Sequence, residues 1–211
     1  AGEVYVQGKQ FEYYSRNALS KLLAYLPQSY TVQWPLKVQR VVELGRLPHL
    51  PWWSHGDSSD ADVVADAMKS ADVTHLSQRV ITSLSGGERA RVLLARVFAT
   101  SPSIILADEP VASLDPYHQL QVMELLQHHA RNGGAVIVVL HDLTLAARYC
   151  DRLLLLDRGT VAASGTVEEV LTPAMLARVY NVEVGIVRDG GRYIVNATRC
   201  LHEPHSRPGK I

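Results

Sequence analysis

The stretch Ile104-Ile105-Leu106-Ala107-Asp108-Glu109-Pro110 indicates the fold class of this 211-residue chain. Its first four residues form a short apolar run, without the polar alternation of a strand that has one solvated face. Two further runs of this kind follow, from Ala135 to Leu140 and from Leu153 to Leu156. The segments between the runs have the length of helices. We therefore predict an α/β fold whose sheet is mostly parallel and flanked by helices.

The composition is that of one folded chain with a sizeable core. Hydrophobic residues make up 47%, which excludes intrinsic disorder. Lys plus Arg and Asp plus Glu both total 21, so the net charge is zero and no basic excess indicates a nucleic-acid partner. Two cysteines, Cys150 and Cys200, are too few for a disulfide framework, and no apolar run reaches the roughly 18 residues of a membrane span. We expect a reducing, cytoplasmic setting.

The character of the sequence changes along the chain and predicts four regions. Residues 1–29 read as the remainder of a β-rich lobe and residues 30–83 as an α-helical subdomain, with helices around 38–44 and 60–71. Residues 84–181 read as the α/β core. Residues 182–211 form a small appendage, in which Asp189-Gly190-Gly191 predicts a hairpin.

The segment Leu84-Ser85-Gly86-Gly87-Glu88-Arg89 precedes a helical pattern of apolar residues. One interpretation is structural, because Ser85 and Glu88 have the spacing of a capping box at a helix start. A capping box does not explain two adjacent glycines, which cost about 1 kcal/mol each relative to alanine inside a helix. The alternative is an anion site, most naturally for phosphate, made by amides, a hydroxyl and the helix dipole.

Asp108 and Glu109 follow a buried strand directly. Ligands of open α/β sheets bind beyond the carboxyl ends of the strands, although solvated loop acids are an alternative. In the functional interpretation Asp108 holds Mg²⁺ through water, and Glu109 orients and activates the water that attacks a phosphoryl group.

His141 directly follows the apolar run that ends at Leu140. A lone histidine is usually structural or exposed to solvent. This one ends the strand expected to neighbour the strand of Asp108, where it could hydrogen-bond a terminal phosphate.

Together these motifs closely resemble those of the ATP-binding subunit of ABC transporters, a P-loop NTPase-like fold. Residues 84–88 resemble the signature motif, residues 108–110 the Walker B motif with its catalytic glutamate, and His141 the switch histidine. Ser113-Leu114-Asp115 is similar to the D-loop, and Gln28 to the Q-loop glutamine that approaches Mg²⁺. Order and spacing agree over roughly residues 1–185.

The resemblance implies a mechanism and partners. Two subunits would sandwich two ATP molecules, so that Ser85, Gly86, Gly87 and Glu88 face the nucleotide of a second ATPase subunit, with a homodimer expected. Transmembrane permease subunits would be moved through the helical subdomain. A periplasmic binding protein would take part indirectly. The subunit would lie peripherally on the cytoplasmic face of the bacterial inner membrane, with ATP and Mg²⁺ as cofactors.

Finer resemblance indicates the branch that imports iron-siderophore, haem or cobalamin. It comes from Gly45-Arg46-Leu47-Pro48-His49, from residues 116–123 and 141–152, and from the end of the core at 165–180. We expect Gln28, Arg46 and His49 to lie at the contact with the membrane subunit.

The sequence departs from the family in one respect. The family requires a Gly-x4-Gly-Lys-Ser/Thr loop that cradles phosphates, and these 211 residues contain none. The two Gly-Lys pairs, at 8–9 and 209–210, are not followed by Ser or Thr. We therefore expect a chain that lacks roughly the first fifth of such a subunit, and that alone neither binds ATP tightly nor hydrolyses it. A soluble ABC-type ATPase unconnected with transport, and a non-catalytic truncated chain, remain the alternatives.

Overall fold

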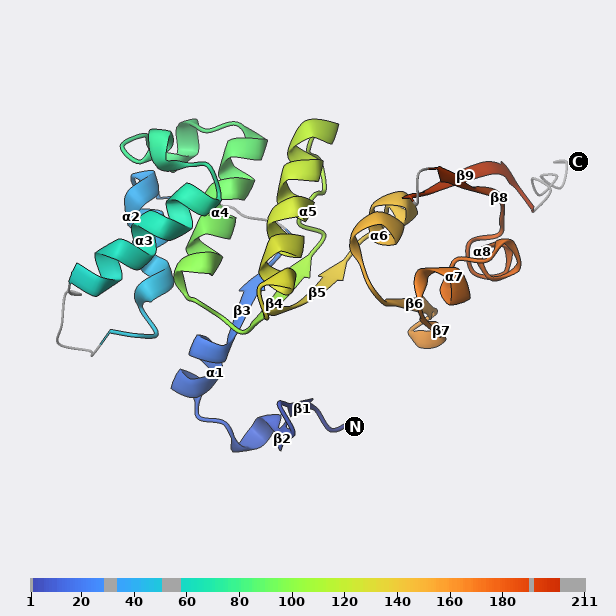
Figure 1. The fold of residues 1–211 in the computed structure, drawn as a ribbon, viewed down its shortest axis with the longest axis horizontal. Helices are drawn as coiled ribbons and strands as arrows, with labels where there is room; N and C mark the ends of the chain where they lie inside the picture. The colour runs from blue at the N-terminus through green and yellow to red at the C-terminus, as the bar shows by residue number, and fades with distance from the viewer. Residues whose placement is uncertain (1, 29–33, 51–57, 190–191, 202–211) are drawn as a thin grey trace, which may run out of the picture. The chain divides into compact units, whose positions relative to one another are not determined.

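The computed structural model describes residues 2–28, 34–50, 58–189 and 192–201. The chain forms two compact units, Ala1–Val139 and Leu140–Ile211 (Figure 1). This division falls after Val139, whereas the sequence suggested boundaries after residues 29, 83 and 181.

A three-stranded parallel sheet lies at the centre of the first unit. Its strands are β3 (Leu23–Leu26), β4 (Ile104–Asp108) and β5 (Ala135–Val139), in the order β3-β4-β5. Leu106 pairs with Tyr25 on one side and with Ile137 on the other. The parallel sheet predicted from the apolar runs is confirmed, and the short apolar piece before Pro27 supplies its third strand.

One face of this sheet is buried and the other is open. Ala24, Leu26, Ile105 and Ala107 are at most 8% exposed, on the side where α4 (Gly86–Ala99) contacts β3 and α5 (Pro116–Arg131) contacts β5. On the opposite face, Tyr25, Ile137 and Val139 are 51%, 63% and 49% exposed. The apolar run at 135–139 therefore forms a strand as predicted, but it is not buried on both faces.

The helices of residues 30–83, predicted as a helical subdomain, pack against α4, which lies in the region predicted as the α/β core. α2 (Val38–Glu43) and α3 (Ser58–Ser70) both contact α4, and Val38, Val42, Leu93 and Leu94 are fully buried. The 3-10 helix η2 (Leu44–Arg46) packs closely against α4. A Cβ atom at Gly45 would lie 2.2 Å from the carbonyl oxygen of Arg96. Two further 3-10 helices, η3 (Thr74–Leu76) and η4 (Ile81–Ser83), lead into α4.

The beginning of the chain forms a short hairpin followed by a helix. β1 (Tyr5–Val6) and β2 (Lys9–Gln10) are antiparallel, and the 3-10 helix η1 (Phe11–Tyr13) follows. α1 (Arg16–Leu22) is capped by Ser15, whose hydroxyl accepts a hydrogen bond from the Ala18 amide at 3.2 Å. This region, predicted as the remainder of a β-rich lobe, therefore also contains a helix.

The second unit has its own core of Leu155, Val170, Leu176 and Val184. Its elements are α6 (Leu143–Tyr149), β6 (Leu153–Asp157), β7 (Thr160–Gly165), α7 (Val167–Val170), α8 (Pro173–Tyr180), β8 (Val182–Asp189) and β9 (Arg192–Cys200). β8 and β9 form the predicted hairpin.

The third apolar run behaves differently from the prediction. β6 forms where it was expected, but its hydrogen-bonded neighbour in the described residues is β7, and the pair is antiparallel. The turn at Gly159 allows this pairing, since its φ of +79° lets the chain reverse immediately after Asp157. Among the described helices, none is long and apolar enough to cross a membrane.

Candidate functional site

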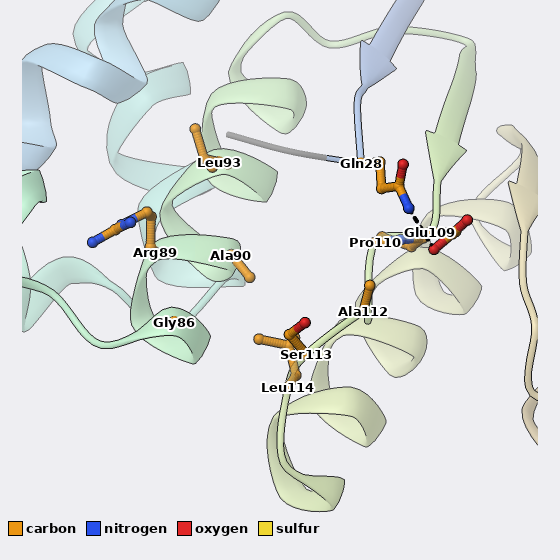
Figure 2. Close-up of a pocket in the computed structure, with 10 residues that line it drawn as sticks. All are labelled: Gln28, Gly86, Arg89, Ala90, Leu93, Glu109, Pro110, Ala112, Ser113 and Leu114. Carbon is orange, nitrogen blue, oxygen red and sulfur yellow. Dashed lines mark hydrogen bonds between the residues drawn. The ribbon is translucent and has the colours of Figure 1, made fainter. Parts of the chain in front are cut away.

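A pocket of about 570 Å3 lies in the first unit, beside the carboxyl end of the parallel sheet. Three segments line it: Gln28 after β3, the first two turns of α4 through Gly86, Arg89, Ala90 and Leu93, and the loop after β4 from Glu109 to Leu114 (Figure 2). Figure 2 shows Ala90 directed toward Ser113 and Leu114, while the Arg89 guanidinium points away from them. The pocket thus brings together residues of four motifs predicted from the sequence.

Glu109 is held at the edge of this pocket by its backbone and by Gln28. Its amide donates to the Val139 carbonyl at 3.1 Å, which extends the β4–β5 ladder by one residue. Its φ of +47° then turns the chain away from the sheet. Gln28 Nε2 donates a hydrogen bond to Glu109 Oε2 at 2.7 Å. The two residues that the sequence assigned to separate motifs are therefore direct partners.

Asp108 has a partner that sequence reasoning missed. The Tyr25 hydroxyl donates to Asp108 Oδ2 at 3.3 Å, from the neighbouring strand β3. Desolvation and the nearby Asp108 carboxylate raise the pKa of Tyr25, so the phenol stays protonated as a donor. Tyr25 pairs with Leu106, so its side chain lies on the same face of the sheet as that of Asp108, and the sequence alone does not give this register.

The start of α4 is a capping box, as the structural interpretation of the sequence predicted. Ser85 Oγ accepts from the Glu88 amide at 3.2 Å, and the Ser85 amide donates to Glu88 Oε2 at 2.8 Å. Arg79 Nη1 bonds Glu88 Oε1 at 3.2 Å. The bond from the Ser85 backbone is the largest factor that lowers the pKa of Glu88. Ser85 and Gly86 remain exposed, so capping does not occupy the outer surface of this helix end.

The two predicted D-loop residues have different surroundings. Ser113 lines the pocket and has a left-handed backbone with φ of +62°. Asp115 caps α5: its Oδ1 accepts from the His118 amide at 3.1 Å, and its Oδ2 lies 2.6 Å from His118 Nδ1. The hydrogen bond from His118 lowers the pKa of Asp115. His118 was not singled out from the sequence, although the Asp-Pro-x-His spacing is that of a helix cap.

Arg46 and His49 face inward. Arg46 Nε pairs with Asp60 Oδ1 at 2.7 Å, and its Nη1 donates to the Ala99 carbonyl at 2.8 Å. His49 Nε2 bonds the Thr100 carbonyl oxygen at 2.9 Å. Both side chains therefore fasten this segment to the carboxyl end of α4, whereas Leu47 between them is 60% exposed.

His141 is exposed and lies in the second unit, immediately before α6. The following residue, Asp142, caps that helix: its Oδ1 accepts from the Thr144 and Leu145 amides at 2.8 and 2.9 Å. The cap fixes the backbone after His141. Its predicted role toward a phosphate stays a prediction.

The donor set at the sheet end suits Mg²⁺ held mainly by phosphate and water. Within the described residues no cluster of three or more His, Cys, Asp or Glu side chains could hold a metal by itself. Asp108 and the amide of Gln28 supply hard oxygen atoms at neighbouring strand ends, and Mg²⁺ characteristically uses one or two carboxylates beside substrate phosphates.

The fold and the pocket define a class of protein. Residues 1–112, more than half of the chain, match the family described as ABC transporter. The chain belongs to this family, and its α/β fold with a parallel sheet is that of the family's ATPase domains.

Individual relatives are named for transport of haem and metal chelates. The chain is 46% identical over 188 residues to the hemin import ATP-binding protein HmuV of Thermobifida fusca (strain YX), covering 88% of this chain and 65% of that protein. A solved inward-facing transporter of the metal-chelate type aligns with a TM-score of 0.76 at 26% identity, over 84% of this chain and 71% of the solved one. A dimeric ATP-binding cassette with bound ADP and phosphate aligns with a TM-score of 0.66 at 27% identity, over 79% and 74%.

Proposed function

We propose that the protein is the ATP-binding and ATP-hydrolysing subunit of an importer for haem or iron chelates. The observation that carries the proposal is the Gln28–Glu109 hydrogen bond at the carboxyl ends of two neighbouring parallel strands. It places an amide and a carboxylate together at the position where α/β proteins bind phosphate ligands. The relatives named for hemin import supply the cargo class.

Each site residue has a proposed task that matches its surroundings. Glu109 orients the attacking water and takes its proton, and Gln28 holds the Glu109 carboxylate in place. Ser85, Gly86, Gly87 and Glu88 form a helix start suited to a phosphate, with Ser85 and Gly86 exposed for contact.

The remaining predicted site residues have separate proposed tasks. Ser113 lines the pocket, while Asp115 orders the first turn of α5. His141 bonds the terminal phosphate. Bound Mg²⁺ neutralises charge on the phosphate oxygens, and Asp108 and Gln28 are the residues that would hold it.

The proposed partners are a second copy of the subunit and transmembrane permease subunits, with a periplasmic binding protein engaged indirectly. The dimeric cassette among the structural relatives supports the pairing. Because Arg46 and His49 bond backbone carbonyls inside the first unit, they would shape the contact with the membrane subunit, and the exposed Leu47 would touch it. The proposed location is the cytoplasmic face of the bacterial inner membrane.

The catalytic part is tested with protein expressed from the complete reading frame. We expect Mg²⁺-dependent ATP hydrolysis, and we expect Glu109→Gln to bind ATP while turnover falls about a thousandfold, since the general base is lost. Glu124→Gln is the matched control, because Glu124 is exposed on α5 and does not line the pocket. Undiminished turnover by Glu109→Gln removes Glu109 from this role.

The cargo class is tested by reconstituting the subunit with its permease in vesicles. ATP-dependent uptake of haem or an iron chelate is the expected result, and cobalamin and ferric siderophores are compared in the same assay. ATP hydrolysis without uptake of any of these compounds would instead favour an ATPase unconnected with this transport.

A further inference from the structure

The two glycines at the start of α4 have different surroundings. A Cβ built on Gly86 would meet one atom, Leu114 Cδ2, at the ordinary contact distance of 3.8 Å. A Cβ built on Gly87 would lie 2.2 Å from Cδ2, 2.3 Å from Cγ and 2.6 Å from Nε2 of His118. The space that any other residue would need at position 87 is therefore filled by an imidazole ring of the same chain.

This ring is fastened at its other edge. His118 Nδ1 lies 2.6 Å from Asp115 Oδ2, and the His118 amide donates to Asp115 Oδ1 at 3.1 Å. Tyr117 packs edge-on against the imidazole, with 5.4 Å between ring centroids. The ring cannot leave Gly87 without also breaking its bond to Asp115.

A second connection joins the same two helices one turn further along. Arg91, which is 7% exposed, donates from Nη1 to Gln121 Oε1 at 2.6 Å, and Gln121 Nε2 donates to the Tyr117 hydroxyl at 3.0 Å. The first turns of α4 and α5 are therefore joined by a ring contact and by a chain of side-chain hydrogen bonds.

We propose that His118 is a positioning residue, which sets the first turn of α4 against the first turn of α5, and that Gly87 is a glycine because the His118 ring occupies the space of its side chain. The consequence is that the exposed Ser85 and Gly86 keep a fixed position relative to the loop that carries Glu109 and Ser113. This inference rests on the proposed function only for its effect on catalysis. The geometry is tested separately.

The geometric test is a double-mutant cycle in the 211-residue chain, measured as hydrogen exchange at the amides of Glu88 and Arg89, which are bonded to Ser85. With His118 present, Gly87→Ala forces the ring away, and we expect exchange there to become at least about tenfold faster. With His118→Ala, the same substitution meets no ring, and alanine is the better helix former. Gly87→Ala should then leave exchange unchanged or slow it.

Gly86→Ala is the matched control, since its Cβ has room and does not touch His118. Its effect on exchange should be the same in both backgrounds. If Gly87→Ala alone fails to fold while the double variant folds, the proposal is supported. An equal effect of Gly87→Ala with and without His118, or a double variant as unfolded as the single one, overturns it.

The catalytic arm uses protein from the complete reading frame together with its permease. We expect Gly87→Ala to lower kcat about tenfold and to change KM for ATP less than kcat, because the α4 turn is displaced relative to the loop that carries Glu109. The double variant should turn over faster than Gly87→Ala. A slower double variant overturns the positioning role. Absence of ATP hydrolysis in every variant, with the exchange coupling intact, contradicts the proposed function and not the geometry.

Discussion

Gln28 donates from Nε2 to Oε2 of Glu109 across 2.7 Å, although the two residues are 81 positions apart in the sequence. The bond joins residues that lie just beyond the carboxyl ends of β3 and β4. The position of Gln28 therefore bears directly on the position of the Glu109 carboxylate. Coupling of this kind needs only one hydrogen bond, and a single substitution can remove it.

Replacing Gln28 by leucine should lower ATP turnover about tenfold in protein from the complete reading frame, because Glu109 loses its orienting partner. The free energy of unfolding should change by less than about 0.5 kcal/mol, since the bond is exposed. Gln39→Leu is the control: Gln39 also bonds a glutamate, Glu43, at 3.0 Å, on the surface of α2. Equal ATP turnover in the two variants would show that the Gln28–Glu109 hydrogen bond does not contribute to hydrolysis.

The capping box of α4 should make stability depend on pH. The pKa of Glu88 is below its ordinary value of 4.5 in the folded chain, so its carboxylate stabilises the fold above pH 4.5. That contribution is lost as pH falls from 4.5 through the lower folded value. Urea unfolding at pH 7 and at pH 3.5 measures the loss.

Glu88→Gln should reduce this pH dependence, because glutamine still accepts the hydrogen bond from the Ser85 amide but does not titrate. Part of the dependence will remain, since hydrogen bonds also lower the pKa of Asp115 and of Glu169. Ser85→Ala should cost about 1 kcal/mol at pH 7. An unchanged pH profile in Glu88→Gln would contradict the assignment.

Arg46→Ala should destabilise the first unit by about 2 to 3 kcal/mol, because it breaks a largely buried ion pair and a bond to a helix-end carbonyl. The Arg46 and Asp60 side chains are 12% and 19% exposed. Arg40→Ala is the control, since Arg40 is 73% exposed in its pair with Glu43 and should cost about 0.5 kcal/mol or less. The free energies of unfolding of the two variants, measured by chemical denaturation, give this comparison. If Arg46 serves only a partner contact, its replacement will leave stability unchanged.

Thr144→Val should destabilise the second unit by about 1 to 2 kcal/mol. The Thr144 hydroxyl accepts from the Val195 amide at 3.1 Å and lies 3.2 Å from the Val195 carbonyl, so it fastens β9 to the start of α6. Valine keeps the shape and removes both bonds. Thr198→Val, which loses one exposed bond to the Glu183 carbonyl, should have a smaller effect on the unfolding midpoint. Matching midpoints would mean that the hairpin is held by apolar packing alone.

Much of the fold could be predicted because local patterns were strong. The apolar runs before Asp108 and before His141 became parallel strands, and the Ser85–Glu88 spacing became a capping box. The pairing of β6 could not be predicted, because an apolar run does not encode which neighbour it bonds, and the choice depends on the tight turn at Gly159. The exposure of Ile137 was also missed, because an apolar run does not show which face of its strand other elements cover.

The candidate site was predictable wherever a motif names its residues. Gln28, Glu109 and Ser113, which three separate motifs single out, line one pocket, and their roles stay predictions. Contacts made through tertiary packing were not visible in the sequence: the ring of His118 against Gly87 joins residues 31 positions apart, and Arg46 turns inward because a helix-end carbonyl lies within its reach.

The backbone of Glu109 adopts a left-handed conformation that lowers the stability of the fold. A residue with a side chain at φ of +47° is strained, and glycine would adopt that angle without penalty. Glu109→Gly should therefore be about as stable as the natural chain or more so, while it removes the carboxylate. Selection for thermal stability alone, in a library randomised at this position, would favour the inactive glycine. Under the proposed function, the carboxylate of Glu109 is the property that would outweigh this backbone cost.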